Sequence, residues 1–187
     1  MVAVFTGAYE MMQRRLDGLR KQQNLAAEFF FHYADASKRV KTAFFDALSE
    51  VPFAARVIVG DKAELPDSWH RMRGQRTVER FVAEAVVEAG REMVENAVLI
   101  FDGPRRETKT IQGIRVAISH LFEERELDYR LKKVTARPAI EEDGLQVADM
   151  ICGAALDEAT AGSPGYLARL GKKVEIIRVP EKENRPG

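Results

Sequence analysis

The chain has 187 residues, enough for one domain with a substantial hydrophobic core. Basic and acidic residues each number 29, so the net charge at pH 7 is zero, which excludes a strongly basic nucleic-acid coat but not a local charged patch. The single cysteine, Cys152, cannot form an internal disulfide and fits a reducing compartment. The N-terminal apolar run is too short for a signal peptide, and no run approaches the roughly 20 apolar residues of a membrane span. We therefore expect a cytoplasmic protein without membrane association.

The first half of the sequence alternates short apolar runs with longer amphipathic ones. Apolar side chains at the period of an α-helix predict helices, and short β-branched or aromatic runs predict strands. A serine before the second helix is a candidate N-cap, and a proline follows its end. In chain order, we predict a strand at 2–7, a helix at 9–23, a strand at 28–33, a helix between Ser37 and Pro52, and a strand at 56–59.

The second half continues this alternation after residues 63–75, which lack a clear period and predict a loop. The run at 97–101 is the most strand-like in the chain and ends in an Asp-Gly-Pro turn signal. In chain order, we predict a helix from Thr77 to Met93, a strand at 97–101, a helix at 111–122, a strand at 129–135, a helix at 143–160 and a strand at 174–179.

Strands separated by helices along the whole length predict an α/β fold with a mixed, mostly parallel central sheet flanked by helices. No repeat, low-complexity segment or linker divides the sequence. We therefore expect a single domain over residues 1–180, followed by a charged, flexible tail at 181–187.

The common catalytic motifs are missing from the sequence: it has no Gly-rich phosphate loop, no G-x-S-x-G and no H-E-x-x-H. The histidines His32, His70 and His120 lie far apart, and surface or packing roles suit them better than metal ligation. Cys152 lies on a helix expected to pack inward, where a small buried hydrophobe is a better interpretation than a nucleophile.

Two carboxylates are better candidates for a functional site. Asp102 follows the strand 97–101, and ligands of parallel α/β sheets bind beyond the carboxyl ends of strands. Asp149 lies mid-helix among apolar residues, where aspartate is a poor helix former and a buried carboxylate needs a partner or a cation. The structural alternatives are a turn cap for Asp102 and a solvated helix acid for Asp149.

Residues 144–154 (GLQVADMICGA) resemble the C-terminal L-Q-x-A-D-x-x-x-G signature of an uncharacterised family called domain of unknown function 3800. Other pieces agree in order with weaker motifs of the family. The segment from Glu28 to His32 resembles its E-F-H-type segment, residues 52–62 resemble a strand that ends in an acid or polar residue and a lysine, and residues 98–102 resemble a strand with a terminal aspartate. The likeness spans nearly the whole chain.

The resemblance implies a ribonuclease H-like fold and a divalent-metal-dependent nuclease or phosphoryl-transfer protein that acts on nucleic acid. In such chemistry two Mg²⁺ or Mn²⁺ ions about 4 Å apart clamp the attacking and leaving oxygens, and Mg²⁺ prefers carboxylate and water oxygens. His32 would assist proton transfer or pack among its aromatic neighbours. The implied site comprises the metal ligands Asp102, Asp149 and Glu28, with Gln146 orienting a carboxylate or phosphate and Lys62 contacting substrate phosphate.

The chain departs from the family in two places. It lacks the opening D-E-S-G strand, which supplies the leading acid, and residues 2–7 resemble the family's second strand. It also has Thr-Ala-Arg-Pro at 135–138, where the family often has Asp-Ser. We therefore expect either a truncated chain or a degenerate member whose two-metal centre is weak or absent, because metal affinity follows ligand charge and number.

Two non-catalytic functions stay open. A member of the same fold could bind nucleic acid, with Arg71, Arg73 and Arg76 around Trp69 contacting phosphate, although these residues also fit a solvated loop. Alternatively, a sheet that lacks one strand exposes unpaired backbone groups, which favours pairing with a second copy or a partner chain through that edge.

Overall fold

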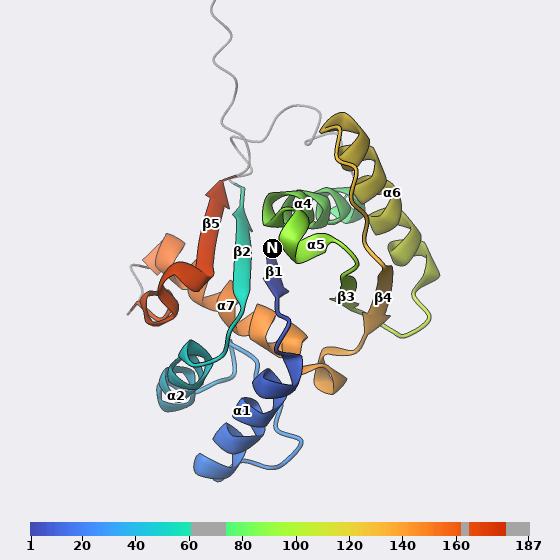
Figure 1. Ribbon diagram of the computed structural model, residues 1–187. Helices are drawn as coiled ribbons and strands as arrows, with labels where there is room; N and C mark the ends of the chain where they lie inside the picture. The colour runs from blue at the N-terminus through green and yellow to red at the C-terminus, as the bar shows by residue number, and fades with distance from the viewer. Residues whose placement is uncertain (61–73, 162–164, 179–187) are drawn as a thin grey trace, which may run out of the picture.

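The fold is known from a computed structural model that describes residues 1–60, 74–161 and 165–178 (Figure 1). Helices and strands alternate along the chain, which confirms the predicted α/β class. The elements are β1 (Val2–Phe5), α1 (Tyr9–Gln22), α2 (Lys38–Ser49), β2 (Ala54–Val59), α4 (Gly74–Ala89), α5 (Arg91–Val94), β3 (Val98–Asp102), α6 (Thr108–Glu124), β4 (Lys133–Arg137), the 3₁₀ helix η1 (Ala139–Glu141), α7 (Asp143–Ala161), the 3₁₀ helix η2 (Leu167–Lys173) and β5 (Val174–Arg178).

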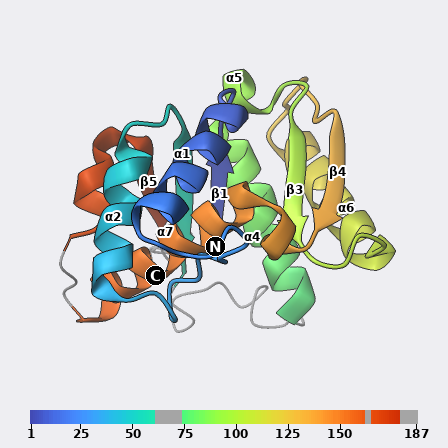
Figure 2. The same cartoon turned by 90° about the horizontal axis from the view of Figure 1, so that it is seen from below.

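The strands form two sheets where the sequence predicts one. The first has the order β1-β2-β5, with β1 antiparallel to β2 and β2 parallel to β5. The second consists of the parallel pair β3-β4. Figures 1 and 2 show the strands in one row across the molecule. Strand β1 is the edge of the first sheet that lies toward β3 of the second sheet. The division between the two sheets therefore falls between β1 and β3.

The aromatic segment 28–33 is not a strand, so this prediction is wrong. Its side chains anchor it without sheet pairing: Phe31 is fully buried and Tyr33 is 6% exposed. Two of its backbone N–H groups donate to side chains of α7 instead of to a neighbouring strand. Apolar content alone cannot reveal this difference, because a strand and an anchored loop bury the same residues.

Most other predicted elements occur with shifted ends. Ser37 caps α2 as expected, since its hydroxyl accepts a hydrogen bond from the Val40 N–H at 3.3 Å. The strand predicted at 129–135 begins later, as β4, and α4 begins at Gly74, inside the predicted loop. Residues 61–73 and the predicted tail at 181–187 lie outside the described residues.

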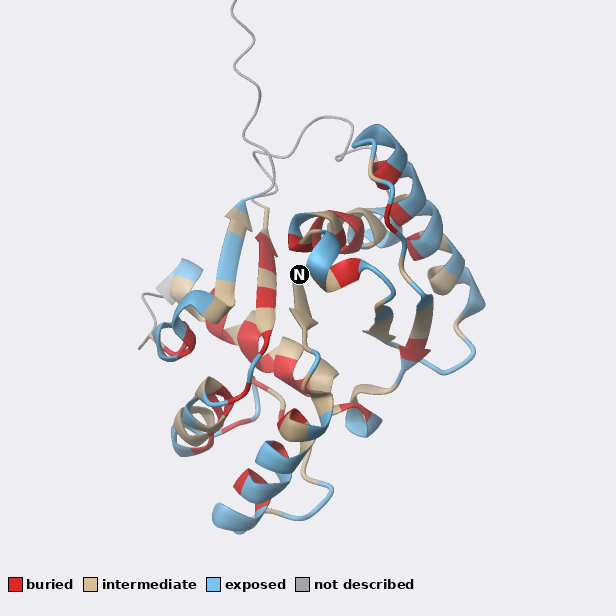
Figure 3. Ribbon diagram, viewed as in Figure 1, coloured by how far each residue is buried: buried red, intermediate tan, exposed pale blue. Residues whose placement is uncertain are grey.

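Two hydrophobic clusters fill the molecule (Figure 3). Core one lies among α1, α2, α7, η2, β2 and the loop formed by residues 29–33, called the anchored loop below, and includes Phe44 and Met150. Core two lies among α4, α5 and α6 beside β3 and β4, and includes Ile114 and Leu121. Strand β1 touches both, because its successive side chains point to opposite faces.

Within the described ranges, no helix is long and apolar enough to cross a membrane.

Candidate functional site

The Gln-x-x-Asp motif lies on α7, and its two polar side chains contact the anchored loop 29–33. Gln146 and Asp149 are three residues apart, so they lie on one face of the helix. Each accepts a hydrogen bond from a backbone N–H of the loop: Phe31 donates to Gln146 Oε1 at 3.0 Å, and Tyr33 donates to Asp149 Oδ2 at 2.9 Å. The motif therefore fastens a loop that is 115 residues away in sequence.

Gln146 is 2% exposed, and all of its hydrogen-bonding atoms are used. Besides the Phe31 N–H, its Oε1 accepts from Arg20 Nη2 at 3.3 Å. Its Nε2 donates to the Ala139 carbonyl at 3.1 Å. A buried amide with these three partners holds α1, the anchored loop and η1 against α7, and both lone pairs of its oxygen are already used.

Asp149 is partly exposed, and its second oxygen lies near a histidine. Asp149 Oδ1 is 3.8 Å from His32 Nε2, and His32 Nδ1 is 3.0 Å from Asp35 Oδ2. The two carboxylates therefore lie on opposite sides of the imidazole ring, so they flank the histidine instead of converging with it on a single cation. The arrangement can orient the imidazole ring.

Asp102 lies at the end of β3, as the sequence predicts, and the structure shows it exposed. Its Oδ1 accepts a hydrogen bond from the Ala139 N–H at 2.9 Å. Because Gln146 binds the carbonyl of the same residue, Asp102 and Gln146 together fix both polar backbone groups of Ala139. Asp102 thus acts as a cap for the turn that leads from β4 into η1.

Glu28, the other predicted site residue that the structure describes, does not join this group. Glu28 is exposed in a turn before the anchored loop, and Lys62 lies outside the described residues. His120 is exposed on α6, and Cys152 is a half-buried free thiol. Of the candidate phosphate-contacting residues, Trp69, Arg71 and Arg73 fall outside the described residues, as does His70, whereas Arg76 is exposed near the start of α4.

Sequence reasoning missed a buried polar group that joins α1 to the start of α7. Arg20 is 6% exposed and donates to Asp143 Oδ1 at 2.7 Å, to Asp17 Oδ1 at 2.9 Å and to the Phe29 carbonyl at 3.0 Å. Glu142 is 2% exposed and accepts from Arg137 Nη1 at 2.8 Å and from the Tyr9 hydroxyl. Burial, followed by the bond to Glu142, raises the pKa of Tyr9. The acidic residues Glu142 and Asp143, at the start of an apolar helix, are the one sequence signal for this group.

These residues do not fit the two-metal centre that the family resemblance implies. Among the described residues, no group of three or more His, Cys, Asp or Glu side chains is placed to hold a metal ion. One oxygen each of Asp102 and Asp149 is already bonded to a backbone N–H. The carboxylates are thus explained by backbone capping, and we derive no metal-dependent step from them.

Comparisons with known proteins add no assignment. No family model, no curated protein and no solved structure matches the chain. The resemblance to domain of unknown function 3800 therefore stays a prediction, and so do Mg²⁺ or Mn²⁺ binding and the cytoplasmic location.

Proposed function

We propose that this chain is a non-catalytic, protein-binding member of the ribonuclease H-like fold, which takes an extended segment of a partner polypeptide between β1 and β3. The observation that carries the proposal is the division of the sheet at this point. A strand inserted there would join β5-β2-β1 to β3-β4 in one mixed sheet flanked by helices, which is the architecture that the sequence predicts.

The free edge of β1 follows from its pairing with β2. Met1 and Ile58 exchange two backbone hydrogen bonds, at 3.0 and 2.8 Å, so they form a hydrogen-bonded pair of the antiparallel ladder. Such pairs recur every second residue, so the backbone N–H and C=O groups of Ala3 also point toward β2. Val2 and Val4 consequently direct their N–H and C=O groups away from β2, toward the side of β3.

The free edge of β3 follows in the same way from its pairing with β4. The Ala97 carbonyl accepts from the Lys132 N–H at 2.8 Å, and the Gly103 N–H donates to the Arg137 carbonyl at 3.1 Å. The backbone N–H and C=O groups of the odd-numbered residues of β3 therefore point toward β4. Val98 and Ile100 direct their backbone groups to the opposite side, so β1 and β3 present complementary donors and acceptors to a strand between them.

The side chains beside this position specify an apolar occupant. Phe5, Leu99 and Phe101 pack against core two, whereas Val2 and Val4 pack against core one. Helix α7 contacts both β1 and β3. The sequence of a strand that is covered on both faces is typically a continuous apolar run rich in β-branched residues. The expected partner segment therefore has this composition.

The competing function is a Mg²⁺- or Mn²⁺-dependent nuclease. The proposal predicts that an oligonucleotide of DNA or RNA is not cleaved by this chain with either ion. It also predicts that Asp149→Asn changes nothing in this assay. Metal-dependent cleavage that disappears in Asp149→Asn would contradict the proposal and restore the nuclease function.

Amide hydrogen exchange tests the open edges directly. In the chain alone we expect fast exchange at Val2, Val4 and Ile100, and slower exchange at Ala3, which is bonded to β2. The probe is an acetylated and amidated hexapeptide, Thr-Val-Ile-Val-Ile-Thr, which should slow exchange at the three open positions.

Val4→Pro is the matched variant, because proline removes an N–H that forms no ladder bond with β2 and is tolerated at strand edges. It should leave the fold intact and abolish the protection by the peptide. Exchange that is unchanged by the peptide in the unsubstituted chain would overturn the proposal. Protection that instead grows with protein concentration, and is lost in Val4→Pro, would assign the edge to a second copy of the chain.

A further inference from the structure

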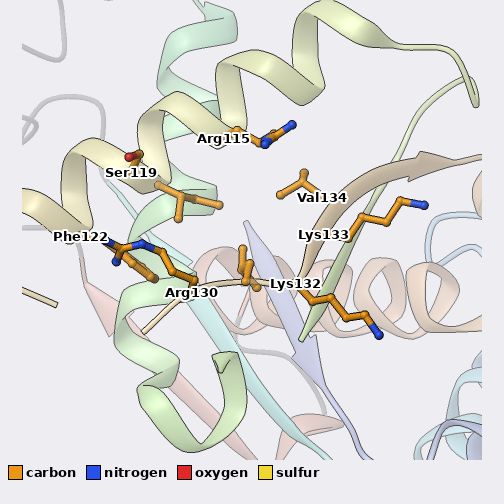
Figure 4. A pocket seen from close by; sticks show the side chains of 9 residues that line it. Arg115, Ser119, Phe122, Arg130, Lys132, Lys133 and Val134 are labelled. Carbon is orange, nitrogen blue, oxygen red and sulfur yellow. The ribbon is translucent and has the colours of Figure 1, made fainter. Parts of the chain in front are cut away.

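A pocket between α6 and the segment leading into β4 combines an apolar floor with a cationic rim (Figure 4). Its volume is about 350 Å³, within the size range of ligand sites. Ile118 and Phe122 form part of the floor. The charged lining residues are Arg115, Arg130, Lys132 and Lys133, and no described lining residue is acidic. In a chain of zero net charge, this is a local positive region.

The cationic groups are available to a ligand. Arg115, Lys132 and Lys133 are exposed, and none of them forms an ion pair with a described residue. Arg130 Nη1 is held by the carbonyls of Leu127 and Tyr129, at 3.0 and 2.9 Å. A guanidinium has five N–H donors, so this fixing leaves others free for an anion.

The arrangement of the charges indicates the class of ligand. Figure 4 shows that the charged ends of Arg115, Arg130, Lys132 and Lys133 do not converge on one point, and that those of Lys132 and Lys133 extend outward from the pocket. A single phosphate requires converging donors, whereas a polyanion engages several separated cations at once. The apolar floor between the cations suits the face of an unstacked base.

We propose that this pocket binds single-stranded nucleic acid, with one nucleotide over the apolar floor and neighbouring phosphates on the cationic rim. This site is separate from the edges of β1 and β3, and it uses no residue of the Gln-x-x-Asp motif. Binding is electrostatic and independent of divalent metal, because the protein contacts are cations and apolar groups.

The test is a titration of a fluorescent single-stranded thymidylate dodecamer in the absence of divalent metal. Four phosphate contacts on a single strand predict a fall in affinity of about 50-fold between 50 and 200 mM salt. The double variant Lys132→Ala with Lys133→Ala should bind more weakly and lose about half of this salt dependence.

The control is Lys38→Ala with Arg39→Ala, which removes the same charge from exposed positions of α2, on the opposite side of the molecule from α6 (Figure 1). It should bind the dodecamer like the unsubstituted chain. Equal weakening by the two double variants, or no salt dependence, would overturn the proposal. Tighter binding to vesicles containing phosphatidylserine, with the same dependence on Lys132 and Lys133, would also overturn it and assign the surface to a membrane.

Discussion

Core one and core two differ in how polar groups take part in their packing. In core one, Gln146, Asp149 and Arg20 bind backbone or side-chain groups that are distant in sequence, such as Phe31 and Tyr33. In core two, apolar faces of α4 and α6 meet, and the ion pairs beside them join side chains to each other, such as Arg80 with Glu84 at 2.9 Å and with Glu124 at 3.3 Å. Polar residues inside an apolar helix can therefore have a structural role, in which they hydrogen-bond to backbone groups that are distant in sequence.

The largest expected effect is the loss of the Gln146 amide. Gln146→Leu keeps the approximate volume but leaves the Phe31 N–H and the Ala139 carbonyl without their partner. We expect a fall in the free energy of unfolding of about 3 kcal/mol, measured by urea denaturation. Gln112→Leu, on the exposed face of α6, is the control and should change stability by less than about 0.5 kcal/mol. Equal effects would remove the proposed difference between the cores.

Two glycines, Gly153 and Gly113, differ in the space that is open to an added side chain. A Cβ on Gly153 would lie 2.2 Å from Tyr33 Cγ, and Tyr33 is held in place because its backbone N–H donates to Asp149 and its hydroxyl donates to Asp157. Gly153→Ala should therefore destabilise core one by about 2 kcal/mol, a typical cost of overpacking. A Cβ on Gly113 would meet only the flexible carboxylate end of Glu79.

Gly113→Ala should consequently be neutral or stabilising, because alanine favours the helix over glycine. Thermal or urea unfolding of both variants measures these two changes in stability. A Gly153→Ala protein as stable as the unsubstituted chain would show that the anchored loop can move away from α7.

The role of Asp149 can be separated from metal ligation by comparing two substitutions. Asp149→Ala removes the acceptor of the Tyr33 N–H and should cost about 1 kcal/mol of stability. Asp149→Asn keeps an acceptor oxygen and should restore most of this loss. If the asparagine variant is as unstable as the alanine variant, the negative charge of Asp149 matters more than the backbone bond.

The smallest expected effect appears at alkaline pH. Burial and the bond to Asp157 raise the pKa of Tyr33 in core one; burial also raises that of Tyr129 in core two, but the neighbouring Arg91 opposes this rise. Because the folded-state pKa is above the unfolded value, the stabilisation is complete below pH 10 and declines as pH rises further.

At about pH 10.5 the loss from Tyr33 should be about 0.8 kcal/mol. Tyr33→Phe should reduce this decline more than Tyr129→Phe does, as measured by urea denaturation at pH 8 and at about pH 10.5. The reverse order would contradict the assigned causes of the two pKa shifts.

The sequence predicts those features of the fold and of the candidate site that depend on neighbouring residues, and it fails where the partners are distant in sequence. The helical stripe of α2 and its Ser37 cap are local patterns, and both are found. The aromatic segment 28–33 fails because its backbone partners lie on α7, more than 100 residues away. Asp102 is a turn cap, but for the distant Ala139 and not for the turn that follows its own strand. Arg20 has no local signal, since its environment is built by tertiary contacts.

Strand β1 has a thermodynamic consequence for the whole molecule. Its two valines belong with core one and its phenylalanine with core two, so β1 couples the two clusters, which also meet along α7 and where α4 contacts β2. Because β1 and β3 are not hydrogen-bonded to each other, we expect the two halves to unfold as separate units, each with its own calorimetric transition. A bound strand would merge them into one cooperative unit, which a single calorimetric peak would report.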